Sequence, residues 1–157
     1  MTTQNLSESI QLSLCYQGAA NAVACDIINM EQFIHGRFVV IHTGSSDTDL
    51  VLSLYESDDV AGSNTAAITT AVPIYADTNF GTSSDTLVAQ TADYDYTIDT
   101  GTYPAQCVTF EIDPAILSAG YPCIYLADSG GNASNTCTIF FEGTPRYAGG
   151  TLPTAIA

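Results

Sequence analysis

The chain has 157 residues, of which 17 are Asp or Glu and only two, Arg37 and Arg146, are Lys or Arg, so its net charge is −15 with neutral histidine. Two cations cannot supply the many phosphate contacts of a nucleic-acid-binding protein, nor a basic patch that binds an acidic membrane surface. Hydrophobic residues nevertheless make up 46% of the chain, which excludes a disordered acidic segment and predicts one folded domain.

Short alternating segments separated by turn residues occupy the first part of the chain. Residues 9–15 alternate with period two and predict a strand or an extended arm. Residues 22–27 are a second candidate strand, and residues 37–42 predict a central strand. Residues 49–56 alternate cleanly, so we expect them to pair with the central strand as a hairpin across the turn at residues 44–47.

The same pattern continues to the end of the chain. Residues 66–74 predict a strand that Pro73 places toward a sheet edge. Asp113 followed by Pro114 predicts a single N-capped helical turn. Further strands are expected at residues 86–90, 94–98, 106–112, 122–127 and 136–142.

Eight to ten short strands with at most one helical turn predict an all-β, single-domain fold, a β-sandwich or a jelly-roll or barrel-like relative of it. We expect residues 17–142 to form the sandwich, residues 1–16 an N-terminal arm or edge strand, and residues 143–157 an extended C-terminal tail. No apolar run is long enough to cross a membrane, and residues 1–8 lack the basic and apolar segments of a signal peptide. Synthesis in the cytoplasm is therefore expected.

Five cysteines are present, an odd number with no C-x-x-C spacing and no histidine near a pair of them. This spacing argues against a zinc site. Because free cysteine is among the most buried residue types, we expect most of them to be reduced core residues. The sequence does not exclude one disulfide bond among them.

Catalytic patterns are weak in this sequence, and we expect no enzyme. His35 and His42 are seven residues apart, so on one strand they point to opposite faces. Candidate carboxylate pairs with period-two spacing are read as solvated surface: Asp93, Asp95 and Asp99, and Glu111 with Asp113. No cofactor is predicted; weak Ca²⁺ binding is the most that the acidic loops at residues 47–49, 58–59 and 93–99 indicate.

Four blocks in order along the chain carry a family resemblance. They are residues 24–33 (ACDIINMEQF) leading into 37–44 (RFVVIHTG), residues 52–63 (LSLYESDDVAGS), residues 120–126 (GYPCIYL) and residues 142–148 (EGTPRYA). Together they resemble blocks of small virion structural proteins of tailed bacteriophages, of the capsid decoration or cement type. The chain departs from that pattern at Gly149, where a second proline is usual, and by a first block two residues longer.

The resemblance implies a non-enzymatic protein on the outer capsid surface that clamps adjacent major capsid protein subunits and associates with itself as a homotrimer or homodimer. It implies no nucleic-acid or membrane partner. An edge strand or arm can bind by adding to a neighbour's sheet. Arg146, one of only two cations on an acidic chain, is expected to pair with a carboxylate, either within the chain or across an interface. The residues expected at such interfaces are Arg37, Pro145, Arg146, Tyr147, Leu6, Ile10 and Leu12.

Two alternatives stay open. One is another phage virion component, such as a head–tail connector, a tail protein or a fibre-base protein. The other is a secreted β-sandwich module that binds carbohydrate or calcium, against which the missing signal peptide and the odd cysteine count weigh.

Overall fold

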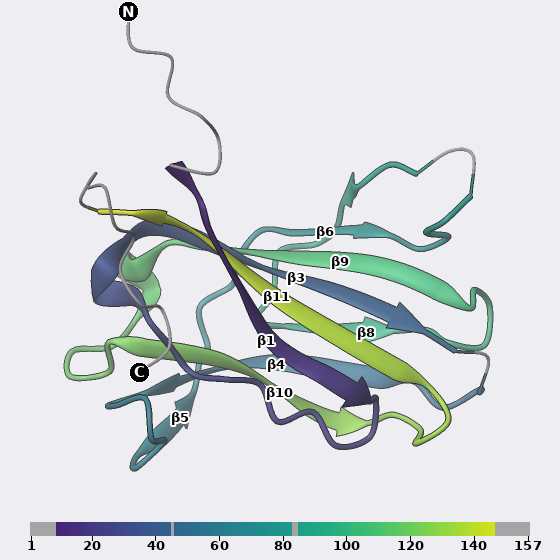
Figure 1. Ribbon diagram of the computed structural model, residues 1–157, viewed down its shortest axis with the longest axis horizontal. Helices are drawn as coiled ribbons and strands as arrows, with labels where there is room; N and C mark the ends of the chain where they lie inside the picture. Colours follow the sequence, from purple (N-terminus) through teal and green to yellow (C-terminus); the bar gives the residue numbers. More distant parts are fainter. Residues whose placement is uncertain (1–8, 45, 83–84, 147–157) are drawn as a thin grey trace, which may run out of the picture.

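The computed structural model describes residues 9–44, 46–82 and 85–146, and these form two antiparallel sheets packed face to face (Figure 1). The all-β sandwich predicted from the sequence is confirmed. The strands, in chain order, are β1 (Gln11–Ala19), β2 (Ile28–Asn29), β3 (Phe33–Thr43), β4 (Leu50–Ser57), β5 (Thr65–Ala67), β6 (Ile74–Asp77), β7 (Val88–Ala89), β8 (Asp95–Ile98), β9 (Ala105–Ile112), β10 (Cys123–Gly130) and β11 (Thr136–Pro145). The described residues include no helix long and apolar enough to cross a membrane.

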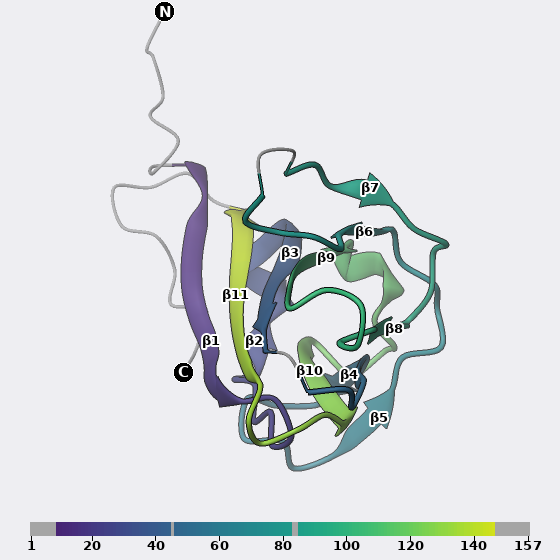
Figure 2. The ribbon, with the colours of Figure 1, turned by 90° about the vertical axis from the view of Figure 1, so that its right-hand side faces the viewer.

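The six-stranded sheet has the order β1-β11-β3-β9-β6-β7, and the five-stranded sheet has the order β2-β10-β4-β5, with β8 also paired to β4. Figure 2 shows the two sheets nearly end-on, with β1 at one margin of the larger sheet. Alternate residues of the central strands β3 and β4 face the other sheet and are fully buried, for example Phe38 and Val40 on β3 and Leu52 and Leu54 on β4. This period-two burial is what the alternating segments of the sequence predict.

A cluster of aromatic rings packs at the contact between β3 and β11. Phe141 on β11 lies edge-on to Phe33 and to Phe38, with ring centroids 5.2 and 5.4 Å apart. Gly36 and Gly143 lie opposite each other on the same two strands. A Cβ on Gly36 would overlap the ring of Phe141, and a Cβ on Gly143 would overlap the ring of Phe33. The two glycines therefore make room for the aromatic cluster.

The predicted hairpin between residues 37–42 and 49–56 is wrong. β3 belongs to the six-stranded sheet, whereas β4 belongs to the other sheet and pairs with β10, β5 and β8. The chain crosses between the sheets after Gly44, whose backbone N–H donates to the carbonyl of Pro104. Both strands bury one face, so their alternation is the same whether they are hydrogen-bonded to each other or stacked across the core.

Two other predicted strands are also corrected. Residues 22–27 form only one isolated bridge, at Ala24 opposite Ala127, because this segment closes the gap between the sheets with the buried Val23 and Cys25. The segment 66–74 is not one strand. Its start lies in β5 of the smaller sheet, and its last residue, Ile74, begins β6 of the larger one.

The strand count in the described chain is eleven, slightly above the expected eight to ten, since β2 and β7 have two residues each. Asp113 caps a 3₁₀ turn at Pro114–Ile116 as predicted, and a second turn not foreseen lies at Met30–Gln32. β1 runs beyond residue 16, and β11 includes residues 143–145, so the strands extend into both predicted terminal segments. Residues 1–8 and 147–157 lie outside the described parts of those segments.

Candidate functional site

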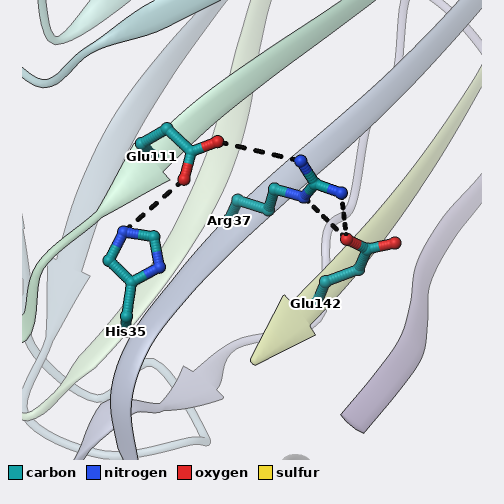
Figure 3. Close-up of polar contacts among 4 residues, drawn as sticks. All are labelled: His35, Arg37, Glu111 and Glu142. Atoms are coloured by element: carbon teal, nitrogen blue, oxygen red, sulfur yellow. Dashed lines mark hydrogen bonds and ion pairs between the residues drawn. The ribbon is translucent and has the colours of Figure 1, made fainter. Parts of the chain in front are cut away.

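A row of charged side chains crosses the outer face of the six-stranded sheet. Arg37 on β3 lies directly opposite Glu111 on β9 and Glu142 on β11. Because opposite residues of antiparallel strands share a face, all three side chains point away from the core. His35 precedes Arg37 by two residues, and its side chain reaches Glu111 on the same face of the sheet (Figure 3).

Arg37 is held between the two glutamates (Figure 3). Its Nε and Nη2 each lie 2.6 Å from Oε2 of Glu142, and its Nη1 lies 3.9 Å from Oε1 of Glu111. Nε2 of His35 lies 3.5 Å from the second oxygen of Glu111. The side chain of Arg37 is 41% exposed, whereas those of the glutamates are 23% and 28% exposed. The guanidinium is therefore oriented by partly shielded carboxylates and still reaches solvent.

A second row, mostly apolar, crosses the same face beside the charged one. Its members lie opposite one another on five successive strands: Leu14, Phe140, Val39, Thr109 and Tyr75. Leu14, at the β1 end of this row, is 50% exposed. Leu12, which is 61% exposed, lies on β1 opposite Glu142 and so adjoins the end of the charged row. Oriented charges next to exposed apolar side chains on a rigid sheet are suited to binding another protein surface.

Part of the interface predicted from the sequence lies on this face. Ile10 and Arg37 line one shallow pocket of about 190 Å³, together with the glutamates at residues 111 and 142. Leu12 adjoins the pocket through its position opposite Glu142. Two predicted interface residues lie outside the described residues: Leu6 and Tyr147.

The other two predicted interface residues, Pro145 and Arg146, lie at the end of β11. Pro145 is opposite Phe33 at the start of β3, and Arg146 donates from Nη2 to the carbonyl of Phe33 at 3.1 Å. Arg146 lines a separate open pocket of about 480 Å³, together with Glu31 and Asp58. Among the described residues no carboxylate oxygen forms an ion pair with Arg146, whereas Arg37 is paired with two carboxylates. A carboxylate partner of Arg146 across an interface stays a prediction.

The carboxylate partners of Arg37 were not identified from the sequence. Glu142 lies 105 residues from Arg37, and no local pattern joins them. Glu111 was considered as a partner of Asp113, but Asp113 instead accepts the N–H of Ala115 at 2.9 Å and caps the following turn. The only available signal was the alternation that turns both glutamates outward; which strands lie side by side had to come from the fold.

The two histidines point to opposite faces, as predicted. His35 lies on the outer face, whereas His42 is fully buried, and neither of its ring nitrogens has a hydrogen-bond partner among the described residues. Burial lowers the pKa of His42, because the charged ring loses its hydration. His42 is therefore a neutral core residue, and its unpaired nitrogens make it sensitive to acid.

All five cysteines are free and buried, which confirms the prediction of reduced core thiols. Burial raises the pKa of Cys123 to about 11 and that of Cys137 to about 12. Burial also raises the pKa of Cys107 on β9. Since the thiolate is the reactive form, these three thiols are poor nucleophiles at neutral pH.

The acidic loop after β4 is occupied by hydrogen bonds within the chain. The carboxylate of Asp59 accepts from the hydroxyl and backbone N–H of Ser63 and from the N–H of Ala61, and these bonds lower its pKa. Asp58 accepts from the backbone and side chain of Asn64. In the part of the chain that the structure describes, no three His, Cys, Asp or Glu side chains are grouped so that they could hold a metal ion.

Comparison with known proteins identifies no relative: no family model, no curated protein and no solved structure matches the chain. The proposal of a function therefore rests on the outer face of the six-stranded sheet and on the sequence blocks.

Proposed function

We propose that this protein is a structural component of a tailed-phage virion that decorates the outer surface of the capsid and stabilises it by clamping adjacent major capsid protein subunits. The observation that carries the proposal is the outer face of the six-stranded sheet. There the ion-paired Arg37 lies beside a mostly apolar row whose two ends, Leu14 and Tyr75, are exposed, on a sheet whose other face packs on the core. The four sequence blocks that resemble phage virion proteins support the same assignment.

The charge of the chain is compatible with this location. A protein on the outside of a shell does not contact the packaged genome, so a net charge of −15 carries no penalty there and keeps the free protein soluble. The outer face of the six-stranded sheet is the surface that we assign to the shell. Its apolar row supplies area to bury, and Arg37 with its glutamates supplies orientation.

The test is reconstitution on particles that lack this protein. Purified protein is added to such particles, and the bound amount is compared with the amount of major capsid protein by quantitative gel densitometry. We expect saturation at a ratio set by the capsid subunits and a higher temperature of genome release. Saturation at a few copies per particle would instead indicate a connector, tail or fibre-base protein, and no binding would refute a virion role on these particles.

A matched pair of variants locates the contact. Tyr75→Glu adds one acid to the outer face of the six-stranded sheet, and Thr97→Glu adds one acid to β8, on the other sheet. We expect Tyr75→Glu to weaken particle binding at least tenfold, because a buried unpaired carboxylate is costly at an interface. Thr97→Glu should bind like the unmodified protein; equal loss in both variants would show that the contact lies elsewhere.

A further inference from the structure

The free edge of β1 is the feature of the molecule that the proposed function leaves unused. β1 pairs with β11 on one side, and no described strand lies on its other side (Figure 2). From Cys15 onward the edge is closed, because the carbonyl of Cys15 accepts the N–H of Asp26 at 3.0 Å. The open stretch is therefore residues 11–14, whose backbone groups pair only with β11 within the described chain.

This open edge lacks the usual protection against strand pairing. Edge strands are normally guarded by a charged side chain, a proline or a short length. β1 has nine residues, with the sequence QLSLCYQGA, and contains neither a charged residue nor a proline. Its two exposed leucines, Leu12 and Leu14, point to the same face. An uncharged apolar edge is unusual in a chain of net charge −15 and indicates a surface that is covered by protein.

The sequence of this edge is self-complementary. Residues 12–14 read Leu-Ser-Leu, the same in both directions about Ser13. In an antiparallel pair with a two-fold axis at Ser13, Leu12 of one copy lies opposite Leu14 of the other, and each Ser13 lies opposite its counterpart. All four leucines then share the outer face, where opposite residues are about 5 Å apart.

We infer that two copies of this chain pair antiparallel through β1, with the two-fold axis at Ser13, so that two six-stranded sheets become one continuous sheet. No unpaired charge on the outer face opposes a second copy at this edge. The nearest acid on the outer face, Glu142, is already paired with Arg37, so the two copies meet without bringing unpaired acids of that face together. This contact goes beyond the proposed function, because binding to the capsid does not require two copies to pair. A dimer would present two capsid-binding faces, one from each copy.

This pairing predicts an unusual salt dependence. The interface is uncharged, whereas the two copies as a whole repel each other with a charge of −15 each. Raising the ionic strength from 0.1 to 1 M shortens the screening length from about 10 to about 3 Å. The dimer should therefore become tighter with salt, whereas an interface built on the ion pairs of Arg37 would become weaker.

The first experiment is sedimentation equilibrium of the full chain in 0.1 and 1 M NaCl. We expect a dimer of twice the 16.5 kDa chain mass, with a lower dissociation constant in high salt. Leu14→Lys should raise that constant at least tenfold, since it removes apolar area twice per dimer and places a charge on the edge. The matched control is Val88→Lys, an exposed apolar residue on β7 at the opposite margin of the same sheet, which should leave dimerisation unchanged.

The second experiment tests the register by cross-linking. Ser13→Cys places two thiols opposite each other across the axis and should give a covalent dimer under mild oxidation, whereas Leu12→Cys should not, because its counterpart lies two residues away. A chain that is monomeric in both salts, or a dimer unaffected by Leu14→Lys, overturns the inference. If the chain is monomeric but Leu14→Lys prevents binding to particles, the edge pairs with a shell strand, and the proposed function stands without the dimer.

Discussion

Acid should destabilise this protein through one buried side chain, His42 on β3. The ring is fully buried, neither nitrogen has a partner in the described chain, and burial lowers its pKa below the ordinary value of 6.5. A group whose pKa is lower in the folded state contributes its full stability above the unfolded pKa and loses it as the pH falls below 6.5. The folded state therefore weakens on acidification, because only the unfolded chain takes up the proton.

The size of the effect follows from the same linkage. The loss of stability between pH 7.5 and pH 5.0 cannot exceed 1.36 kcal/mol for each of the 1.5 pH units below the unfolded pKa of 6.5, so its upper limit is about 2 kcal/mol. For a chain of this length that corresponds to a fall in melting temperature of about 4–8 °C. His42→Leu removes the titrating group and two unpaired nitrogens at similar volume, so this variant should be at least as stable at pH 7.5 and should lose less on acidification.

Thermal unfolding followed by circular dichroism at pH 7.5 and 5.0 measures this difference. The quantity of interest is the shift in melting temperature of the unmodified protein minus that of His42→Leu, which cancels the contribution of the many carboxylates. His35→Leu is the matched control, because it removes the outer-face histidine and leaves the buried ring in place; the acid-induced shift should persist in it. If His42→Leu and the unmodified protein lose the same melting temperature, the assignment of His42 as the acid-sensitive group is wrong.

Two further predictions concern packing and thiols. Gly143→Ala should lower stability by about 1–3 kcal/mol in urea unfolding, because its Cβ would overlap the ring of Phe33, whereas Gly101→Ala, whose nearest neighbours are ordinary contacts, should change it by less than about 0.5 kcal/mol. An equal loss in both variants would contradict the packing account. A thiol reagent at pH 7 should label fewer than one cysteine in the native protein and all five after unfolding in guanidinium, since all five are buried; rapid native labelling would show that the core opens.

The sequence predicted the positions of the strands better than it predicted which strands pair with each other. Alternation located β3 and β4 because each buries one face more deeply than the other, and that pattern is local. It could not show that β4 leaves the sheet of β3, since a strand stacked across the core alternates just as a hairpin partner does. Segment 66–74 failed for a related reason. Its residues are mostly apolar or β-branched, but the chain passes from one sheet to the other between Ala67 and Ile74.

In the candidate site, too, individual residues could be identified from the sequence but their neighbours in space could not. Arg37 was identified because it is one of two cations in an acidic chain, and Leu12 because it alternates in an uncharged segment. Their common face could not be predicted, because β11 and β9 come from the second half of the chain and flank β3 only through the strand order. The partner Glu142 follows from that order, and so does the position of Leu12 opposite it.

The two arginines, the whole of the chain's Lys and Arg, both connect β3 with the end of β11. Arg37 binds Glu142, and Arg146 donates to the carbonyl of Phe33. Apart from Glu111 and Glu142, the carboxylates of the described chain have no lysine or arginine partner. An approaching molecule therefore meets negative potential over most of the described surface, and the potential is least negative near the contact of β3 with β11 and along the uncharged edge of β1. An acidic partner is therefore repelled from most directions. A neutral or basic protein surface is favoured on the outer face of the six-stranded sheet, where oriented charge and exposed apolar area coincide.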